Sequence, residues 1–294
     1  MKSGVKRTTP YKVISIIILV ILAILFLFPL YWIVTGAFKP TTDIYASQPV
    51  WWPSEWVTSN FEKLFTKRSA PLFEIGALVG PTVPAAIRWL VNTVFMSVAA
   101  MLLTCITAAM AGYALAKKRF VGRTLLFSLI ICAMALPKQV ILIPLLKEMS
   151  ALKLYGSLWA VIFPTVGWPF GVFLMKQFCE SVPGEMLEAA RIDGASEART
   201  FTQIVVHLIK PGIGALAIFT FINSWNDYFM QLVMLPNSAN FTISLGIATL
   251  QGESSVDTGL LMSGAALAAV PIIVVFLIFQ KYFTQGITMG AVKG

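Results

Sequence analysis

The amino-acid sequence predicts an all-α, polytopic membrane protein with six transmembrane helices. Of its 294 residues, 57% are apolar and only 12% are charged, whereas about a quarter of the residues in a soluble domain are charged. Long apolar runs recur along the chain, and each exceeds the ~20 residues that a helix needs to span the hydrocarbon of a bilayer. The runs are continuous and do not alternate every second residue, which favours helices over a β-barrel.

Six spans are predicted from these runs. Two of them are interrupted by one charge each, residues 124–146 by Lys138 and residues 211–235 by Asp227. Prolines inside several spans remove a backbone donor, so we expect kinks there. The other four spans carry no Asp, Glu, Lys or Arg and comprise residues 13–38, 89–116, 154–175 and 258–280.

The spans organise the chain into one predicted transmembrane domain, residues 13–284. Residues 1–12 precede this domain, and residues 285–294 follow it as a tail. The first span is too long for the apolar core of a signal peptide, and we expect it to remain as an anchor.

The distribution of Lys and Arg predicts the orientation. With a cytoplasmic N-terminus, fourteen of the 22 basic residues lie in segments on the inner side, in agreement with the positive-inside rule. Both termini are therefore expected in the cytoplasm, and the net charge of +9 largely reflects this bias. A nucleic-acid-binding function is disfavoured, because the basic residues flank the spans and do not form one patch.

Catalytic and cofactor-binding patterns are absent from the sequence. Cys105, Cys132 and Cys179 have no paired spacing, and the single histidine, His207, cannot form a metal site by itself. No G-x-x-x-x-G-K-[ST] loop is present to bind ATP. A Ser-His-Asp set is absent, and no span contains a pair of carboxylates, so these patterns do not suggest an enzyme. We therefore expect a chain that is not an enzyme and that binds no cofactor or metal of its own.

Two ionisable residues lie inside predicted spans, where a charge is costly and therefore points to a function. Asp227 belongs to the polar segment 223–228, which we expect to line a pathway; bridging between helices is the alternative. Lys138 has the same two interpretations and a third, in which it reaches the outer interface. Amide and aromatic groups suit the recognition of sugars. The residues expected to line the pathway are Asn223, Trp225, Asn226, Asp227 and Tyr228.

The polar segment 177–210 lies between the fourth and fifth predicted spans. Ser181 and Ser196 are placed to cap two short helices, and Gly194 suits the left-handed residue that often ends a helix. A helix–turn–helix held between two spans forms a rigid projection. The segment therefore predicts a partner-binding surface.

The segment between the first two spans, residues 40–87, contains Trp51, Trp52 and Trp56. Tryptophan favours the headgroup zone of a bilayer, so an interfacial belt is one expectation. A docking surface for an external partner is an equally good interpretation, and the two do not exclude each other.

Residues 188–195, Glu-Ala-Ala-Arg-Ile-Asp-Gly-Ala, resemble the E-A-A-x-x-D-G-A loop of ABC importer permeases. Phe201, Ile204 and Pro211 follow at the spacing of that family. The six spans and the C-terminal residues are most similar to the second, shorter permease of maltose-type carbohydrate importers, and the resemblance covers residues 13–294. In that family the loop forms coupling helices that insert into a groove on the ATPase subunit. The ATPase-coupling residues that the resemblance implies are Glu188, Ala189, Ala190, Asp193, Gly194 and Ala195.

The resemblance also implies partners and a location. The partners are a second homologous permease, two copies of a cytoplasmic ATPase that bind ATP and Mg, and an extracytoplasmic solute-binding protein that contacts residues 235–257. The complex would lie in the bacterial inner membrane, with residues 285–294 between the ATPase subunits. The implied solute is a sugar or oligosaccharide. The basic residues Lys63, Lys67 and Arg68 suggest an acidic oligosaccharide of the alginate kind.

Two alternatives come from other functional classes. An ion-coupled secondary transporter would work without an ATPase and would use Asp227 as its coupling site, and a membrane scaffold would transport nothing. The 188–195 motif disfavours both.

One departure from the family pattern is His207, which stands four residues before Pro211 where the family usually has a proline. We expect this change to leave the second helix of the loop more continuous with the fifth span.

Overall fold

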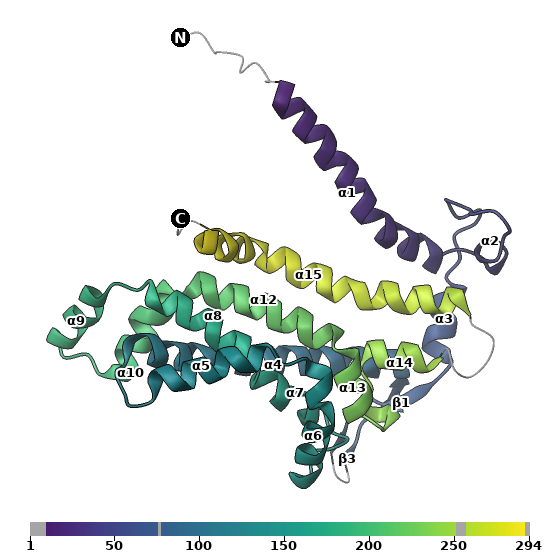
Figure 1. The fold of residues 1–294 in the computed structure, drawn as a ribbon. Coiled ribbons are helices and arrows are strands. Elements are labelled where there is room, and N and C mark those ends of the chain that lie inside the picture. Colours follow the sequence, from purple (N-terminus) through teal and green to yellow (C-terminus); the bar gives the residue numbers. More distant parts are fainter. Residues whose placement is uncertain (1–9, 76–77, 251–256, 292–294) are drawn as a thin grey trace. The chain divides into compact units, whose positions relative to one another are not determined.

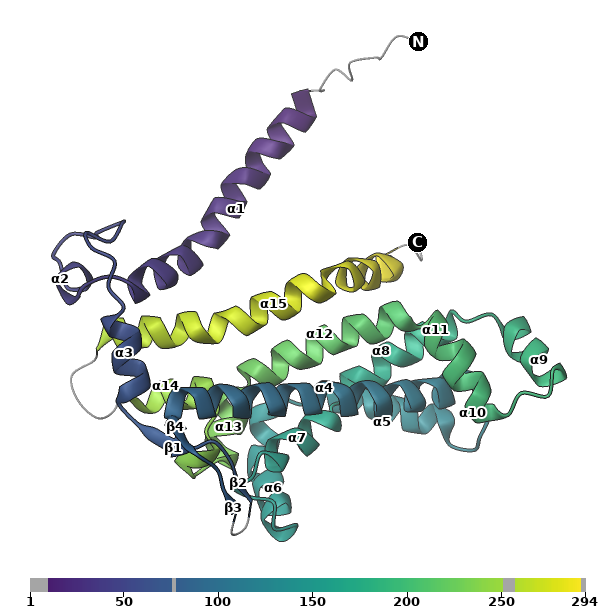
Figure 2. The same cartoon turned by 180° about the vertical axis from the view of Figure 1, so that it is seen from behind.

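The computed structural model describes residues 10–75, 78–250 and 257–291, and helices dominate it (Figures 1 and 2). These residues fall into two compact units, one of residues up to 68 with 250–267 and the other of residues 69–249 with those from 268 onwards. Within the described residues, four helices are long and apolar enough to cross a membrane, or up to six if each of two bent helix pairs counts as one span.

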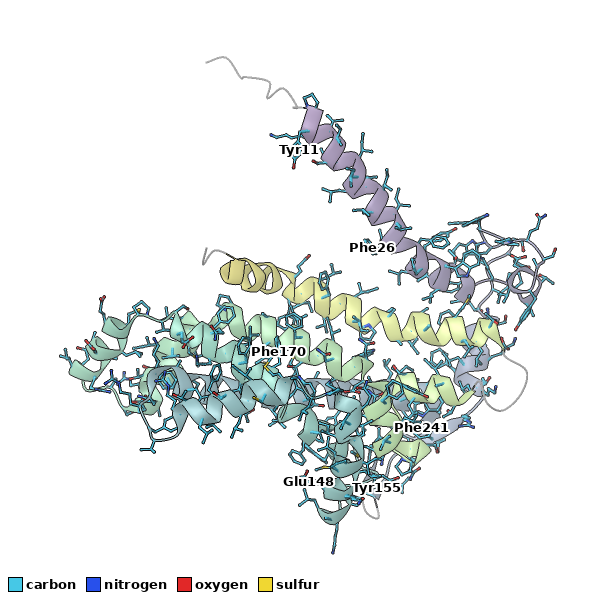
Figure 3. The ribbon with its side chains drawn as sticks, viewed as in Figure 1. Tyr11, Phe26, Glu148, Tyr155, Phe170 and Phe241 are labelled. Carbon is cyan, nitrogen blue, oxygen red and sulfur yellow. The ribbon has the colours of Figure 1, made fainter. Side chains whose placement is uncertain are left out.

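The first unit begins with a long apolar helix that matches the first predicted span. This helix, α1 (Pro10–Ala37), has a mean hydropathy of 3.3 in its most apolar window, none of which is buried. Tyr11 and Phe26 are 78% and 75% exposed and point away from the helix (Figure 3). Apolar residues cover every face of α1 and do not form one stripe, which is typical of a helix surrounded by lipid.

The tryptophan-rich segment folds back onto the end of α1. The Tyr31 hydroxyl donates to the carbonyl oxygen of Trp51 at 2.5 Å. Lys39 Nζ donates to the carbonyl oxygen of Val50 at 2.5 Å and lies 4.0 Å from the centroid of the Trp32 ring. Trp51 itself stays 60% exposed. Aromatic rings therefore gather beside the end of a predicted span, where an interfacial belt would lie.

Two short helices, α2 (Thr41–Ile44) and α3 (Ser59–Thr66), follow in this unit. The Asn60 side chain in α3 donates to the carbonyl oxygens of Ala37 and Lys39 at 3.1 and 2.9 Å. Lys63 forms an ion pair with Asp257 at 3.2 Å, just before α15 (Thr258–Ala291). One of the three basic residues that suggested an acidic solute is thus neutralised within the chain.

The second unit is built around α4 (Ala85–Lys117), which confirms the predicted span 89–116. The helices α8 (Pro169–Glu180) and α12 (Lys210–Asn226) pack along it (Figures 1 and 2). A Cβ atom at Gly112 would lie 2.7 Å from the backbone nitrogen of Lys176. Glycine at this position therefore allows α4 and α8 to approach closely.

Three of the predicted spans are interrupted by breaks. Residues 124–146 do not form one straight helix, because α5 (Arg123–Met134) and α6 (Lys138–Ala151) meet at 109°. Pro137 lies at this corner; it lacks an N–H and disfavours helical geometry in the residue before it. The fourth span is divided into α7 (Trp159–Val166) and α8, and the fifth into α12 and α13 (Tyr228–Met234).

A small antiparallel hairpin corrects the prediction of an all-α chain. Its outer pair joins β1 (Ser69–Pro71) to β4 (Thr82–Pro84), and its inner pair joins β2 (Glu74–Ile75) to β3 (Leu78–Val79). Arg88 at the start of α4 donates to the carbonyl oxygens of Leu72 and Ala239, which ties the hairpin to η2 (Ser238–Asn240). The helix α14 (Ile243–Leu250) follows. Prolines and short apolar runs in this segment do not continue a helix and favour strand edges.

The two ends of the chain were predicted as segments 1–12 and 285–294. Residues 1–9 and 292–294 lie outside the described residues. The helix α15 contains the predicted span 258–280 and continues to Ala291, so most of the predicted tail is helical.

Candidate functional site

The segment between α8 and α12, residues 181–209, forms the predicted helix–turn–helix, here called the 181–209 loop. Gly194 has a φ of 74°, and the Ala195 N–H donates to the carbonyl oxygen of Ala190 at 2.9 Å, which closes the first helix. Ser196 Oγ accepts from the Arg199 N–H at 3.3 Å and caps the second helix, as predicted. The elements are α9 (Gly184–Ile192), α10 (Glu197–Arg199), the π-helical turn η1 (Thr200–Val205) and α11 (Val206–Leu208).

Two local predictions for this loop are wrong. Ser181 does not cap α9; its hydroxyl donates to the carbonyl oxygen of Phe178 at 2.8 Å and closes the end of α8. The second helix is not continuous with α12 either, because the chain bends by 77° between Leu208 and Lys210. Pro211 has no N–H to donate to the carbonyl oxygen of His207, and Ile209 leaves helical geometry, so a break occurs without a second proline at His207.

The motif residues of the loop form an exposed surface. Glu188, Ala189, Asp193 and Gly194 are exposed, Ala195 is half-buried and Ala190 is buried at 5% exposure. Ile192, within the motif, is 86% exposed, and Met186 is 42% exposed. Apolar side chains that stand beside carboxylates on a rigid turn are suited to contact with another protein.

The second helix of the loop is anchored on the end of α4. The Tyr113 hydroxyl donates to Glu197 Oε1 at 2.5 Å, and Lys118 forms an ion pair with the same carboxylate. Hydrogen bonds from Lys118 and Tyr113 hold the pKa of Glu197, which lies outside the predicted spans, below its ordinary value of 4.5. The carboxylate is therefore charged at neutral pH. The loop encloses a cavity of about 220 Å³ against α4, with Tyr113, Lys118, Arg191 and Glu197 in its wall.

A second cavity, of about 340 Å³, lies among α4, α5, α6, α7, α8 and α12 and is here called the break-point cavity. It lies where the chain leaves helical geometry, at the α5–α6 corner and at the start of α8. Of the residues that the structure describes, Lys138 is the single ionisable one in its wall. The lining residues are Thr104, Met134, Lys138, Thr165, Trp168, Phe170, Gly171, Leu216, Phe219, Thr220 and Asn223. Phe170 is labelled on α8 in Figure 3.

Lys138 and Asp227, the two charges predicted inside spans, form an ion pair at 3.2 Å. The pair is partly shielded, with side-chain exposures of 33% and 17%. Lys138 Nζ also lies 4.4 Å from the centroid of the Trp168 ring, and Asp227 Oδ1 accepts from the Met230 N–H at 3.4 Å to cap α13. Of the interpretations left open for Lys138, bridging between helices is confirmed.

The residues predicted to line a pathway occupy different environments. Asn223 lines the break-point cavity, and Asp227 is joined to it through Lys138. Trp225 is 1% exposed and stacks on Phe221 with centroids 5.4 Å apart. Asn226 is exposed and donates to its own helix, and Tyr228 packs against the core.

Several lining residues were not predicted from the sequence. Thr104 belongs to α4, Trp168 lies directly before α8 and Phe170 within it, all far along the chain from residues 223–228. Trp168 directly precedes Pro169, and this proline at the first position of α8 is the one local signal of the break. Among the described residues, no group of three or more His, Cys, Asp or Glu side chains is arranged to hold a metal ion.

Comparison with known proteins identifies the family. Residues 107–289 match the binding-protein-dependent transport system inner membrane component. The arabinooligosaccharides transport system permease protein AraQ of Halalkalibacterium halodurans is 33% identical over 93% of both chains, and AraQ of Bacillus subtilis is 31% identical over 97% of this chain and 96% of that protein. A solved bacterial ABC transporter involved in the import of the acidic polysaccharide alginate has the same fold, with a TM-score of 0.77, 19% identity and coverage of 96% of this chain and 100% of that one. The chain belongs to the family of binding-protein-dependent transport system inner membrane components, which confirms the predicted resemblance to ABC importer permeases.

Proposed function

We propose that this chain is one of two permease subunits of an ATP-driven importer for a sugar or oligosaccharide. Its family membership and the exposed 188–195 motif carry this proposal. The other permease would be homologous and would supply the second half of the pathway. Two copies of a cytoplasmic ATPase would bind ATP and Mg and hydrolyse ATP, and an extracytoplasmic binding protein would deliver the solute.

A carbohydrate solute is supported by the relatives and by the chemistry of the cavity. Two of the relatives above 30% identity are named as permeases for arabinooligosaccharides. The break-point cavity combines aromatic rings with hydroxyl and amide groups. Sugar rings present apolar C–H faces and many hydroxyls, so a site for them needs this combination.

We assign the 181–209 loop to the contact with the ATPase, with Glu188, Ala189, Ala190, Asp193, Gly194 and Ala195 as its central residues. The loop and both termini would then lie in the cytoplasm. The pair α5 and α6 would form one span and α12 with α13 another, giving six crossings with α1, α4, α7 with α8, and α15. Ile192 and Met186 would fill apolar depressions on the ATPase, while Glu188 and Asp193 would pair with its basic residues. The anchor formed by Glu197 would transmit movement of the loop to α4.

The rival function, an ion-coupled secondary transporter, requires a carboxylate that is free to bind a proton or cation. Asp227 is already paired with Lys138. A coupling proton or cation that binds to Asp227 would have to compete with Lys138. The rival therefore has less support than it had from the sequence alone.

Co-purification with candidate ATPase subunits tests the proposal. Gly194→Pro removes the Gly194 N–H, which donates to the Arg191 carbonyl oxygen at 3.1 Å, and it cannot adopt the φ of 74°. We expect this variant and Glu188→Lys to lose the ATPase while they still insert in the membrane.

Two matched controls keep the test specific. Gly184→Pro places proline at the first position of α9, where a helix tolerates it. Glu148→Lys makes the same charge reversal at an exposed position of α6. Both should retain the ATPase. If no ATPase co-purifies with the wild type, the importer assignment fails.

A further inference from the structure

The break-point cavity contains an unsatisfied polar group. Thr104 is 2% exposed, and its Oγ1 has no hydrogen-bond partner among the described residues. A buried hydroxyl without a hydrogen-bond partner is destabilising, and natural sequences rarely keep such a group without a use for it. Thr104 is also a lining residue of the cavity, and because its Oγ1 is itself buried, a rotation about χ1 is needed to turn this hydroxyl toward a bound solute.

The rest of the lining matches one face of a sugar. Phe170 and Phe219 form an edge-to-face pair with centroids 5.6 Å apart, next to the Trp168 ring. The Asn223 Nδ2 donates to the Phe219 carbonyl oxygen at 2.8 Å, which leaves the side-chain oxygen of Asn223 as an acceptor. The volume of about 340 Å³ lies at the lower end of the ~300–1,000 Å³ of small-molecule pockets. One or two sugar units would fill it.

The charges at the cavity cancel. Lys138 is the single ionisable side chain among the described lining residues, and it lies at the first position of α6, where the helix dipole disfavours a cation. Asp227 compensates this cation at 3.2 Å, and Trp168 covers it at 4.4 Å. A carboxylate entering the cavity would lose water without gaining a free cation, which is unfavourable.

From these observations we infer that the break-point cavity is a solute subsite for a neutral sugar unit, and that the Lys138–Asp227 ion pair makes it reject carboxylated sugars. This inference rests on the proposed function and deepens it. Lys138 and Asp227 act as a specificity device, since removal of the Asp227 charge would expose the Lys138 cation to the solute. The aromatic rings and the Asn223 side-chain oxygen supply the affinity for the sugar itself.

The variant Asp227→Asn provides the sharpest test. Asparagine caps a helix as well as aspartate does, so the contact with the Met230 N–H is preserved while the charge is removed. The full importer, with both permeases and the ATPases, is reconstituted in nanodiscs without the binding protein. Dissociation constants are measured by saturation-transfer NMR for galactose and galacturonate, and for glucose and glucuronate. Each pair differs by one carboxylate.

We expect the wild type to bind each neutral sugar at least tenfold more tightly than its acid. Asp227→Asn should shift this ratio by about tenfold toward the acid, since the cation of Lys138 is then unpaired. The double variant Lys138→Gln/Asp227→Asn has no charge at this position and should return the ratio to that of the wild type. Trp168→Ala should weaken binding of the neutral sugars at least fivefold. These results together would support the subsite.

Three results would overturn the inference: no saturable binding of either neutral sugar to the wild type, an unchanged ratio in Asp227→Asn, or an acid-shifted ratio that persists in the double variant. The same nanodiscs separate this failure from failure of the proposed function. If the ATPases are present and hydrolyse ATP but the ratio does not respond, only the subsite is rejected. If the ATPases never assemble with the chain, the proposed function itself is rejected.

Discussion

The 181–209 loop and the break-point cavity differ in how the sequence specifies them. The loop is contiguous: its turn at Gly194, its cap at Ser196 and its motif all lie within about thirty residues. The cavity draws its wall from α4, α5, α6, α7, α8 and α12 and depends on where helices stop. A contiguous surface can be recognised from local spacing, whereas a cavity at helix breaks exists only after the helices have packed.

The two regions nevertheless share one support, because α4 carries Thr104 of the cavity and Tyr113 of the loop anchor. Gly112 lies between these two residues in the sequence. If both regions depend on the packing of α4 against α8, a change at Gly112 should disturb both together.

The largest effect is therefore expected for Gly112→Val. The new Cβ would lie 2.7 Å from backbone atoms of Met175 and Lys176, so the helices must separate. Overpacking of this kind costs about 3 kcal/mol, and the thermal midpoint of the detergent-solubilised complex should fall by several degrees. Gly184→Ala is the control, since no atom lies within 4 Å of a Cβ there. Equal stability of the two variants would contradict a shared support.

Much of the fold was predictable because a span is a local property of composition. The helices α1, α4 and α15 begin and end within a few residues of the predicted spans, apart from the extension of α15 to Ala291. The corner at Pro137 was predicted only as a kink. A proline indicates that a helix is perturbed, but the resulting angle of 109° depends on what the two halves pack against.

The candidate sites were predictable to different degrees for the same reason. Lys138 and Asp227 were each noticeable as charges in apolar runs, but their pairing joins residues that are distant in the sequence. Trp225 was selected for its polar neighbours, although its own side chain is buried against Phe221. Sequence reasoning identifies the chemistry of residues and does not assign the direction in which each side chain points.

A moderate effect is expected for Glu197→Gln, which tests whether the function of the loop depends on its anchor to α4 as well as on its own motif. The ion pair with Lys118 would be lost, while the hydrogen bond from Tyr113 could persist. The Glu197 side chain is 56% exposed, so solvent screening limits the loss to about 1 kcal/mol or less. Glu185→Gln, in the first turn of α9, makes the same change away from the anchor. We expect Glu197→Gln, and not Glu185→Gln, to lower the number of solute molecules transported per ATP hydrolysed several-fold, with the ATPase still bound. An unchanged ratio would show that the loop works without its anchor.

The smallest effect on stability is expected for Thr104→Val in the cavity, and here the sign of the change in stability is more informative than its size. Valine keeps the shape of threonine and removes a hydroxyl that has no partner, so stability should rise by about 0.5 kcal/mol or stay unchanged. Sugar affinity should fall two- to fivefold if the hydroxyl binds the solute.

The control is Thr93→Val. Thr93 is fully buried, and its Oγ1 donates to the Trp89 carbonyl oxygen at 2.7 Å and accepts from the Ile243 N–H at 2.8 Å. Loss of those bonds should destabilise the protein by about 1–3 kcal/mol. Threonines on one helix would then respond with opposite signs, because one hydroxyl is used by the fold and the other is kept for a ligand. If Thr104→Val destabilises the protein as much as Thr93→Val does, the Thr104 hydroxyl is a structural group and no longer supports solute binding in the cavity.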